Sequence, residues 1–305
     1  RYPAPETGEL LSASVREIAI EPSLDGMEAE LVARLNLARP FIVVAAIHPQ
    51  PALGDRIVRA LGAQSIILHD GVVADEETIA KVAAAVEPGV EAVVAVGSGT
   101  INDICKMVAK GRGCTQIVFA NAQSMNGYTS VSTSLPERGF KRSVRAITPT
   151  AAFFDLRVLA AALPRLIRAG LGDSVARPTA QADWLLQHLI LGRPYREAPF
   201  AMLAADEAAL LDGAAALVAG DLGVIRALVR TLVLSGFGMT ICGGSFPASQ
   251  GEHLISHYVE LMAPSIPHSF HGEQIGVASL AMARLQDRVL HLDAPRLHAT
   301  RLDRD

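Results

Sequence analysis

Two histidines, His253 and His257, are four residues apart in GSFPASQGEHLISHYVE, and a third, His271, follows in HGEQIG. On an α-helix, residues four apart lie on the same face, one turn from each other. Imidazole nitrogens are common ligands of Zn²⁺ and related divalent ions. The spacing alone leaves two interpretations open. It fits a metal site, and it fits partly buried polar residues on an amphipathic helix.

A carboxylate could complete such a site. Asp173 follows Gly170 and Gly172 in AGLGDSVAR, a pattern that predicts a helix start, where a carboxylate is favoured by free N–H groups. Taken alone, Asp173 is best interpreted as an N-terminal cap. Combined with two imidazoles, it would leave coordination positions open for water or substrate. A metal held in this way would act as a Lewis acid on a carbonyl or alkoxide oxygen.

The segment VVAVGSGTINDICK joins a pattern typical of a buried strand to a helical pattern. Gly97 and Gly99 lack a Cβ atom, so the backbone can turn sharply and approach a phosphate closely. The free N–H groups of the following helix could then bind a diphosphate. The segment is not a G-x-G-x-x-G fingerprint, because residue 102 is Asn, and no G-K-[ST] follows. From spacing alone, it is either a plain connection or a dinucleotide site.

The composition excludes several classes of protein. The 305 residues are 50% hydrophobic and 19% charged, with a net charge of −4, enough for one large domain or two ordinary ones. No block of five Lys or Arg residues indicates a nucleic-acid partner, and no apolar run approaches the roughly 18 residues of a membrane span. The three cysteines form no CxxC pair. We therefore expect a reducing, cytoplasmic location.

Two structural patterns follow each other along the chain. Short β-branched runs alternate with helical patterns in the first half, which predicts a parallel sheet with flanking helices. The predicted strands are residues 14–20, 40–47, 64–70, 91–99 and 115–121. Helical patterns dominate from about Phe153, beginning with 156–173 and ending with 251–263 and 272–290. We expect an α/β domain at residues 1–152 and an all-α domain at 153–305.

Five motifs in order resemble a known family. They are G-S-G-T-I-N-D-I-x-K, QSMNGYTS, G-x-G-D-S-x-A, E-H-x-x-S-H and H-G-E-Q-x-G, within residues 41–284. The chain resembles the sn-glycerol-1-phosphate dehydrogenase branch of the iron-containing alcohol dehydrogenase and dehydroquinate synthase-like superfamily. The resemblance implies a Rossmann-like N-terminal domain with a parallel sheet, a helical C-terminal domain, and an active site in the cleft between them.

The resemblance also implies a reaction. Members of this branch interconvert dihydroxyacetone phosphate and sn-glycerol 1-phosphate, with NAD or NADP as the cofactor. They hold one divalent metal ion, usually Zn²⁺, with Ni or Fe as alternatives. The expected partner is therefore a small phosphorylated triose or polyol, and we expect a homo-oligomer.

The resemblance assigns roles to individual residues. It places the metal ligands on Asp173, His253 and His271. His257 matches a substrate-side histidine, which we expect to bind substrate and to supply a proton. Asn126 stands where the family has a substrate-contacting aspartate, and Asp173 would also face the substrate. The expected cofactor-binding residues are Gly97, Ser98, Gly99, Thr100, Asn102, Asp103, Asn121, Ser124 and Ser130.

Three departures from the family pattern bear on specificity. Asn126 replaces the aspartate, and Ala120 and Asn121 replace a Pro-Thr pair. The region 45–48 offers no acid to bind the adenosine ribose, which weakens a preference for NAD over NADP. These changes allow relaxed cofactor choice, a different substrate or lost activity.

Three alternative functions follow from these departures and from the superfamily. The chain could be a glycerol or polyol dehydrogenase, a dehydroquinate synthase-like sugar-phosphate cyclase, or a non-catalytic nucleotide-binding member. The cyclases usually carry Gly-Gly-Gly-Val-x-x-Asp at the glycine turn, so GSGTIND argues against the second alternative.

Overall fold

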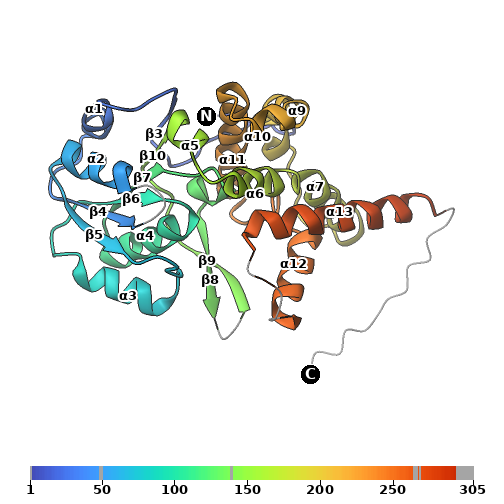
Figure 1. Ribbon diagram of the computed structural model, residues 1–305. Coiled ribbons are helices and arrows are strands. Elements are labelled where there is room, and N and C mark those ends of the chain that lie inside the picture. Colours follow the sequence, from blue (N-terminus) through green and yellow to red (C-terminus); the bar gives the residue numbers. More distant parts are fainter. Residues whose placement is uncertain (1, 48–50, 138–139, 264–266, 268, 293–305) are drawn as a thin grey trace.

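A six-stranded parallel sheet frames the first half of the chain (Figure 1). The computed structural model describes residues 2–47, 51–137, 140–263, 267 and 269–292. The strand order is β3-β10-β7-β6-β4-β5. The bounds are β3 (Glu17–Glu21), β4 (Phe41–Ala46), β5 (Gln64–Leu68), β6 (Ala92–Gly97), β7 (Thr115–Ala120) and β10 (Ala151–Asp155). Because all these strands are parallel, their carboxyl ends meet at one edge of the sheet, where open α/β folds bind ligands.

Four helices connect the strands of this sheet. They are α1 (Glu28–Ala33), α2 (Pro51–Leu61), α3 (Glu76–Ala85) and α4 (Gly99–Arg112). Strands β4 and β6 are almost wholly buried, because helices cover both faces of the sheet. That burial explains why the sequences of these strands are continuous apolar runs rather than alternating patterns. The predicted α/β organisation is confirmed.

Helices form the second half of the chain, as predicted. They are α5 (Leu156–Ala160), α6 (Pro164–Ser174), α7 (Arg177–Leu191), α8 (Ala198–Ala201), α9 (Ala204–Asp212), α10 (Ala214–Val218), α11 (Leu222–Cys242), α12 (Gly251–Met262) and α13 (His271–Leu290). The pattern at 156–173 is two helices, because Pro164 lacks an N–H and begins α6. The predicted helix start at Asp173 is wrong. Asp173 is the penultimate residue of α6, so its carboxylate is no N-terminal cap.

Several strands of the structure were not predicted from the sequence. A hairpin of β8 (Ser132–Glu137) and β9 (Phe140–Arg145) follows β7, and β1 (Tyr2–Pro3) pairs with β2 (Leu10–Leu11). The expected domain boundary after residue 152 falls inside β10, which pairs with β3 and β7. We therefore propose that the sheet domain extends to Asp155.

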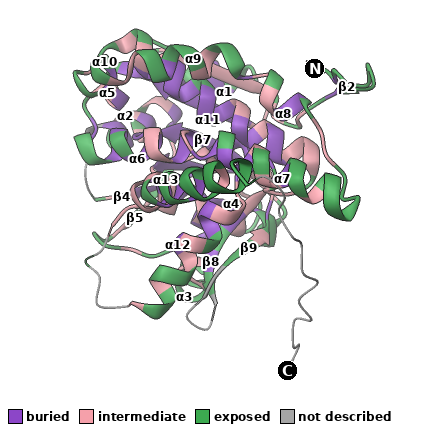
Figure 2. Cartoon of the chain, turned by 90° about the vertical axis from the view of Figure 1, so that its right-hand side faces the viewer, coloured by how far each residue is buried: buried purple, intermediate pink, exposed green. Residues whose placement is uncertain are grey.

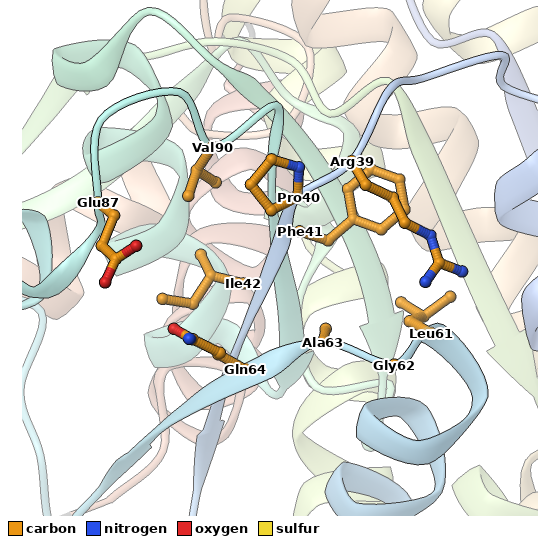
Figure 3. Close-up of a pocket in the computed structure, with 10 residues that line it drawn as sticks. All are labelled: Arg39, Pro40, Phe41, Ile42, Leu61, Gly62, Ala63, Gln64, Glu87 and Val90. Carbon is orange, nitrogen blue, oxygen red and sulfur yellow. The ribbon is translucent and has the colours of Figure 1, made fainter.

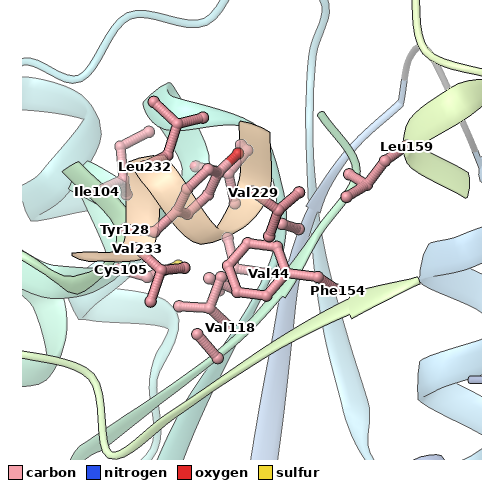
Figure 4. Close-up of a cluster of buried hydrophobic side chains, with 14 of the residues drawn as sticks. Val44, Ile104, Cys105, Val118, Tyr128, Phe154, Leu159, Val229, Leu232 and Val233 are labelled. Atoms are coloured by element: carbon pink, nitrogen blue, oxygen red, sulfur yellow. The ribbon is translucent and has the colours of Figure 1, made fainter. Parts of the chain in front are cut away.

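One buried cluster joins the sheet to the helical half of the chain. Side chains on one face of β4, β7 and β10 pack against both α4 and α11, which lie on the same face of the sheet (Figure 4). The labelled members include Val44, Val118, Phe154, Ile104, Cys105, Val229, Leu232 and Val233. The shared core fixes α11 against the sheet.

Helix α11 is also long and apolar enough to cross a membrane, with a mean hydropathy of 1.5. However, 61% of its most apolar window is buried inside the protein. Figure 2 shows buried positions along α11, between α9 and the sheet. We therefore interpret α11 as a core helix of the protein.

A buried ionic network anchors β10 to α1 and α2. The Arg56 guanidinium lies 2.6 Å from Glu28 Oε1 and 3.1 Å from Asp155 Oδ2. Both carboxylates are almost completely buried. Asp155 also accepts the N–H groups of Leu24 and Arg157, so it caps α5. Because buried charges are costly unless paired, each member of the network depends on the others.

Replacing Asp155 with alanine is expected to lower the free energy of unfolding by about 3 kcal/mol, because it removes a buried ion-pair partner of Arg56 and uncaps α5. Urea denaturation measures the change. The control is Lys81→Ala, which removes an exposed ion pair with Glu77 and should cost under about 0.5 kcal/mol. An Asp155 variant as stable as the Lys81 variant would contradict this account.

Candidate active site

Three side chains from three helices converge at one point. Asp173 of α6, His253 of α12 and His271 of α13 each place one potential ligand atom within 4.8 Å of the others. His271 Nε2 lies 3.9 Å from Asp173 Oδ1, and the rings of His253 and His271 have centroids 5.1 Å apart. These are the three residues expected to be metal ligands.

Glycines make this convergence sterically feasible. A Cβ atom on Gly172 would lie 2.1 Å from the carbonyl oxygen of Gly272, and one on Gly272 would lie 1.8 Å from that of Ala169. Only glycine fits at such backbone contacts, because no side-chain rearrangement can relieve them. Helices α6 and α13 therefore cross with their backbones touching (Figure 1). The crossing sets Asp173 next to His271.

The Asp173 carboxylate is nearly inaccessible, with 1% of the residue exposed. Its Oδ2 accepts the backbone N–H of Asn126 at 2.7 Å, while Oδ1 has no hydrogen-bond donor in the described part of the chain. Burial raises the pKa of this carboxyl, and His253, the Asn126 N–H and Arg177 act in the opposite direction. A buried oxygen without a donor is unfavourable. A divalent cation between the carboxylate and two imidazoles would satisfy it, and this donor set suits Zn²⁺, Ni²⁺ or Fe²⁺.

His257 lies beside this cluster, one turn along α12 from His253. Its ring centroid is 6.2 Å from that of His253 and 6.5 Å from that of His271. About a third of its side chain is exposed, whereas His253 is buried. The two histidines therefore differ in environment, and His257 is the one that solvent or a small substrate can reach.

Asn126 reaches the cluster through its backbone. It begins the 3-10 helix η1 (Asn126–Thr129), and its side-chain amide donates to the Ser235 hydroxyl of α11 at 3.3 Å. The side chain is thus directed toward α11 in this conformation. The expected contact of the Asn126 side chain with substrate stays a prediction.

The glycine turn joins β6 to α4 at the carboxyl edge of the sheet. Gly97 ends β6, and Ser98 precedes the first residue of α4 without a side-chain capping bond to any described residue. A Cβ atom on Gly97 would lie 2.7 Å from Ile101, so the turn requires glycine there. Ser98, Gly99 and Thr100 are partly exposed. The first-turn N–H groups of α4 are therefore oriented for an anion such as a diphosphate.

The other expected cofactor residues fall into two groups. Asn121 lies beside the turn, since its N–H donates to the carbonyl of Gly97 at 3.2 Å, and Ser124 is partly exposed on the same loop.

The second group lies in α4. Asn102 is buried and accepts hydrogen bonds from Gln116. Asp103 is partly buried, and burial raises its pKa to about 6, with Lys106 opposing. Contacts of these residues with a cofactor stay predictions.

The loop after β7 connects the glycine turn to the metal-ligand cluster. A Cβ atom on Gly99 would lie 3.2 Å from the thioether of Met125, and the next residue, Asn126, donates to Asp173. One short segment thus touches both groups of residues, and a ligand spanning them would lie along it.

Sequence comparisons decide the family. Residues 19–163 match the iron-containing alcohol dehydrogenase family. The chain is 30% identical over 276 residues to the glycerol-1-phosphate dehydrogenase (NAD(P)+) of Thermococcus kodakarensis, covering 88% of this chain and 77% of that protein. It is 31% identical over 288 residues to the Geobacillus thermodenitrificans enzyme of the same name, covering 90% and 71%. The chain belongs to the glycerol-1-phosphate dehydrogenase branch of this family.

A solved structure of another dehydrogenase has a similar fold to this family member. The glycerol dehydrogenase of Schizosaccharomyces pombe superposes with a TM-score of 0.76 at 18% sequence identity, covering 92% of this chain and 73% of that chain. At this identity the likeness concerns the fold alone. It agrees with the predicted Rossmann-like sheet followed by a helical domain.

Lys106 of this dehydrogenase was not predicted from the sequence as a functional residue. This residue ends the motif GSGTINDICK and is completely buried in α4. Its ammonium donates to the carbonyl oxygens of Gly127, Ser130 and Ser132 at 2.5, 2.7 and 3.1 Å. Burial lowers its pKa to about 8, with Asp103 opposing. Lys106 therefore ties the helix of the glycine turn to η1, which holds Asp173.

Ser130 belongs to this Lys106 network. It is 1% exposed, and its hydroxyl donates to the carbonyl of Ser132 at 2.8 Å. The side chain faces the protein interior, so its expected cofactor contact stays a prediction. The signal for the network in the sequence is a lysine within the otherwise apolar helical run ICKMVA.

We expect the adenosine ribose of the cofactor to lie just past the carboxyl end of β4. Ala45 and Ala46 end this strand, Ile47 is exposed, and His48 lies outside the described residues. A separate hollow of about 260 Å³ lies at the opposite, amino ends of β4 and β5 (Figure 3). Its lining includes Arg39 and Glu87. Because open α/β sheets bind ligands at their carboxyl ends, we do not place the cofactor in this hollow.

Proposed function

We propose that this protein is a metal-dependent, NAD(P)H-linked dehydrogenase that interconverts dihydroxyacetone phosphate and sn-glycerol 1-phosphate. The observation that carries the proposal is the convergence of Asp173, His253 and His271 around a buried carboxylate oxygen that lacks a donor. Relatives named for this activity match most of the chain. We further propose a homo-oligomer located in the cytoplasm.

We propose Asp173, His253 and His271 as the residues that hold the metal, Zn²⁺ first and Ni²⁺ or Fe²⁺ as alternatives. When bound, the metal supplies Lewis acidity toward the substrate carbonyl. The protein limits the access of water to the metal position, since Asp173 and His253 are buried. Water exclusion strengthens the electrostatic interactions of the site.

The remaining residues bind and orient the reactants. The N–H groups that follow Gly97 would hold the cofactor diphosphate, and Asn121 lies beside them. The loop from Asn121 to Asn126 then leads to the cluster, so the nicotinamide end would lie along it. The missing acid after β4 favours acceptance of both NADH and NADPH. His257 would deliver the proton to the substrate oxygen, since an imidazole can titrate near neutral pH.

Replacing His257 with alanine is expected to lower kcat by about 100-fold, the low end for loss of a general acid, while the bound metal stays at the wild-type level. Steady-state kinetics and metal analysis on the same samples measure both quantities. The control is His188→Ala, an exposed histidine of α7 outside the cluster. Full activity and unchanged substrate affinity in the His257 variant would remove it from the mechanism.

Substrate comparison tests the function itself. We expect NADH oxidation with dihydroxyacetone phosphate at a kcat/KM at least about 100-fold above that with unphosphorylated dihydroxyacetone, a difference of roughly 3 kcal/mol. Preference for the unphosphorylated compound would identify a polyol dehydrogenase instead. Consumption of a sugar phosphate without net NADH oxidation would identify a cyclase. Metal and cofactor binding without turnover would identify a non-catalytic member.

A further inference from the structure

Glu252 directly precedes His253 in the first turn of α12 and is completely buried. Its Oε1 accepts the backbone N–H of Gln250 at 2.9 Å and lies 2.8 Å from Nδ1 of His253. Its Oε2 lies 3.5 Å from the hydroxyl of Thr179 on α7. A buried carboxylate is unfavourable unless it is hydrogen-bonded, so these contacts determine where it sits.

The contact with His253 determines which ring nitrogen carries the proton. An ionised carboxylate can only accept, so Nδ1 must be the donor. A neutral imidazole has one N–H and one lone pair, which leaves the lone pair on Nε2. A metal ligand needs this lone pair, and His253 lies in the cluster with Asp173 and His271.

We propose that Glu252 is a positioning residue, which holds His253 as the Nδ1–H tautomer and thereby presents Nε2 to a divalent cation. This inference rests on the proposed metal site. Carboxylates that accept the second N–H of a histidine ligand fix the ring orientation and raise the basicity of the ligand. Without Glu252, part of the His253 population would adopt a tautomer or a ring orientation that cannot bind the metal.

A competing explanation is that Glu252 only caps α12 through the N–H of Gln250. The substitution Glu252→Ala separates the two explanations, because a cap alone predicts lower stability with unchanged metal affinity and an unchanged His253 tautomer. Glu252→Gln is the conservative variant. The Gln250 N–H and Nδ1 of His253 both contact Oε1, so an amide oxygen at this position can accept both N–H groups.

The test measures metal affinity and tautomer rather than activity. Metal-stripped wild type, E252Q and E252A are titrated with Zn²⁺ against a chromophoric chelator. We expect the Kd for Zn²⁺ to rise about 10- to 100-fold in E252A and by less in E252Q, which keeps an acceptor for Nδ1 of His253. The matched control T179V removes the long contact to Oε2 and a hydrogen bond to the carbonyl of Ala176, but it leaves Oε1 untouched. Its Kd should stay within about threefold. ¹⁵N-histidine NMR of metal-free protein at a pH where imidazole is neutral should show His253 protonated on Nδ1 in wild type and in E252Q, and this state should no longer dominate in E252A.

Two results would overturn the proposal. One is a folded E252A variant whose Kd for Zn²⁺ equals that of wild type. The other is metal-free wild type with His253 protonated on Nε2, a measurement that decides the matter even if both variants fail to fold. Failure of wild type to reduce dihydroxyacetone phosphate, combined with the expected affinities, would reject the proposed function and leave the role of Glu252 intact.

Discussion

Replacing Asp173 with asparagine is expected to abolish metal retention and to lower kcat/KM by at least about 1,000-fold, equivalent to roughly 4 kcal/mol of transition-state stabilisation. The amide oxygen can still accept the Asn126 N–H, so the local hydrogen bond survives. What disappears is the negative charge beside His253 and His271. Metal analysis after gel filtration and steady-state kinetics measure both effects.

The raised pKa of Asp173 predicts that the asparagine variant folds stably, so loss of metal in this variant would not be a result of unfolding. Burial raises this pKa, so the ionised carboxylate destabilises the metal-free protein above the ordinary pKa of an aspartate. The asparagine variant should therefore be at least as stable as metal-free wild type at pH 7. Asp206→Asn, which removes a surface partner of Arg230, is the control and should retain the metal. Normal turnover with one equivalent of metal in the Asp173 variant would refute the site assignment.

Replacing Gly272 with alanine is expected to destabilise the protein by about 3 kcal/mol, at the upper end for overpacked sites, and to weaken metal binding. The new Cβ atom would lie 1.8 Å from the carbonyl oxygen of Ala169, so α13 must move away from α6. Because Asp173 and His271 sit at this crossing, their separation must grow. Thermal or urea denaturation and Zn²⁺ titration measure the two consequences.

The control is the same substitution at Gly111 in α4, where an added Cβ atom meets nothing within 4 Å. There alanine should stabilise the protein by up to about 1 kcal/mol, because it is the better helix former. Opposite signs at the two glycines would support the helix crossing as the feature that positions the ligands. Equal and small effects would contradict it.

Much of this architecture could be predicted from residue patterns. Continuous apolar runs such as FIVVAA and AVVAVG predict buried parallel strands, and β4 and β6 are such strands. The 3.6-residue period correctly predicted helices in the second half. Helical spacing also placed His253 and His257 one turn apart, but only the fold shows that the first is buried and the second partly exposed.

Other features depend on tertiary contacts that local patterns do not carry. The glycines before Asp173 suggested a helix start, whereas both lie near the end of α6. Gly172 allows the crossing with α13, and Gly170 allows close contact with the carbonyl of Gln123. Strand β10 was missed because its place in the sheet depends on pairing with β3 and β7, which are distant in sequence. The roles of Lys106 and Glu252 depend on which acceptors and donors the fold brings to them.

Metal reconstitution tests the central claim most directly. The protein is stripped with a chelator, supplied singly with Zn²⁺, Ni²⁺ or Fe²⁺, and assayed for oxidation of NADH and of NADPH in the presence of dihydroxyacetone phosphate. We predict no activity in the stripped protein and restored activity with at least one metal, with both cofactors accepted. Absence of turnover under all six combinations, or full turnover in the stripped protein, would contradict the account.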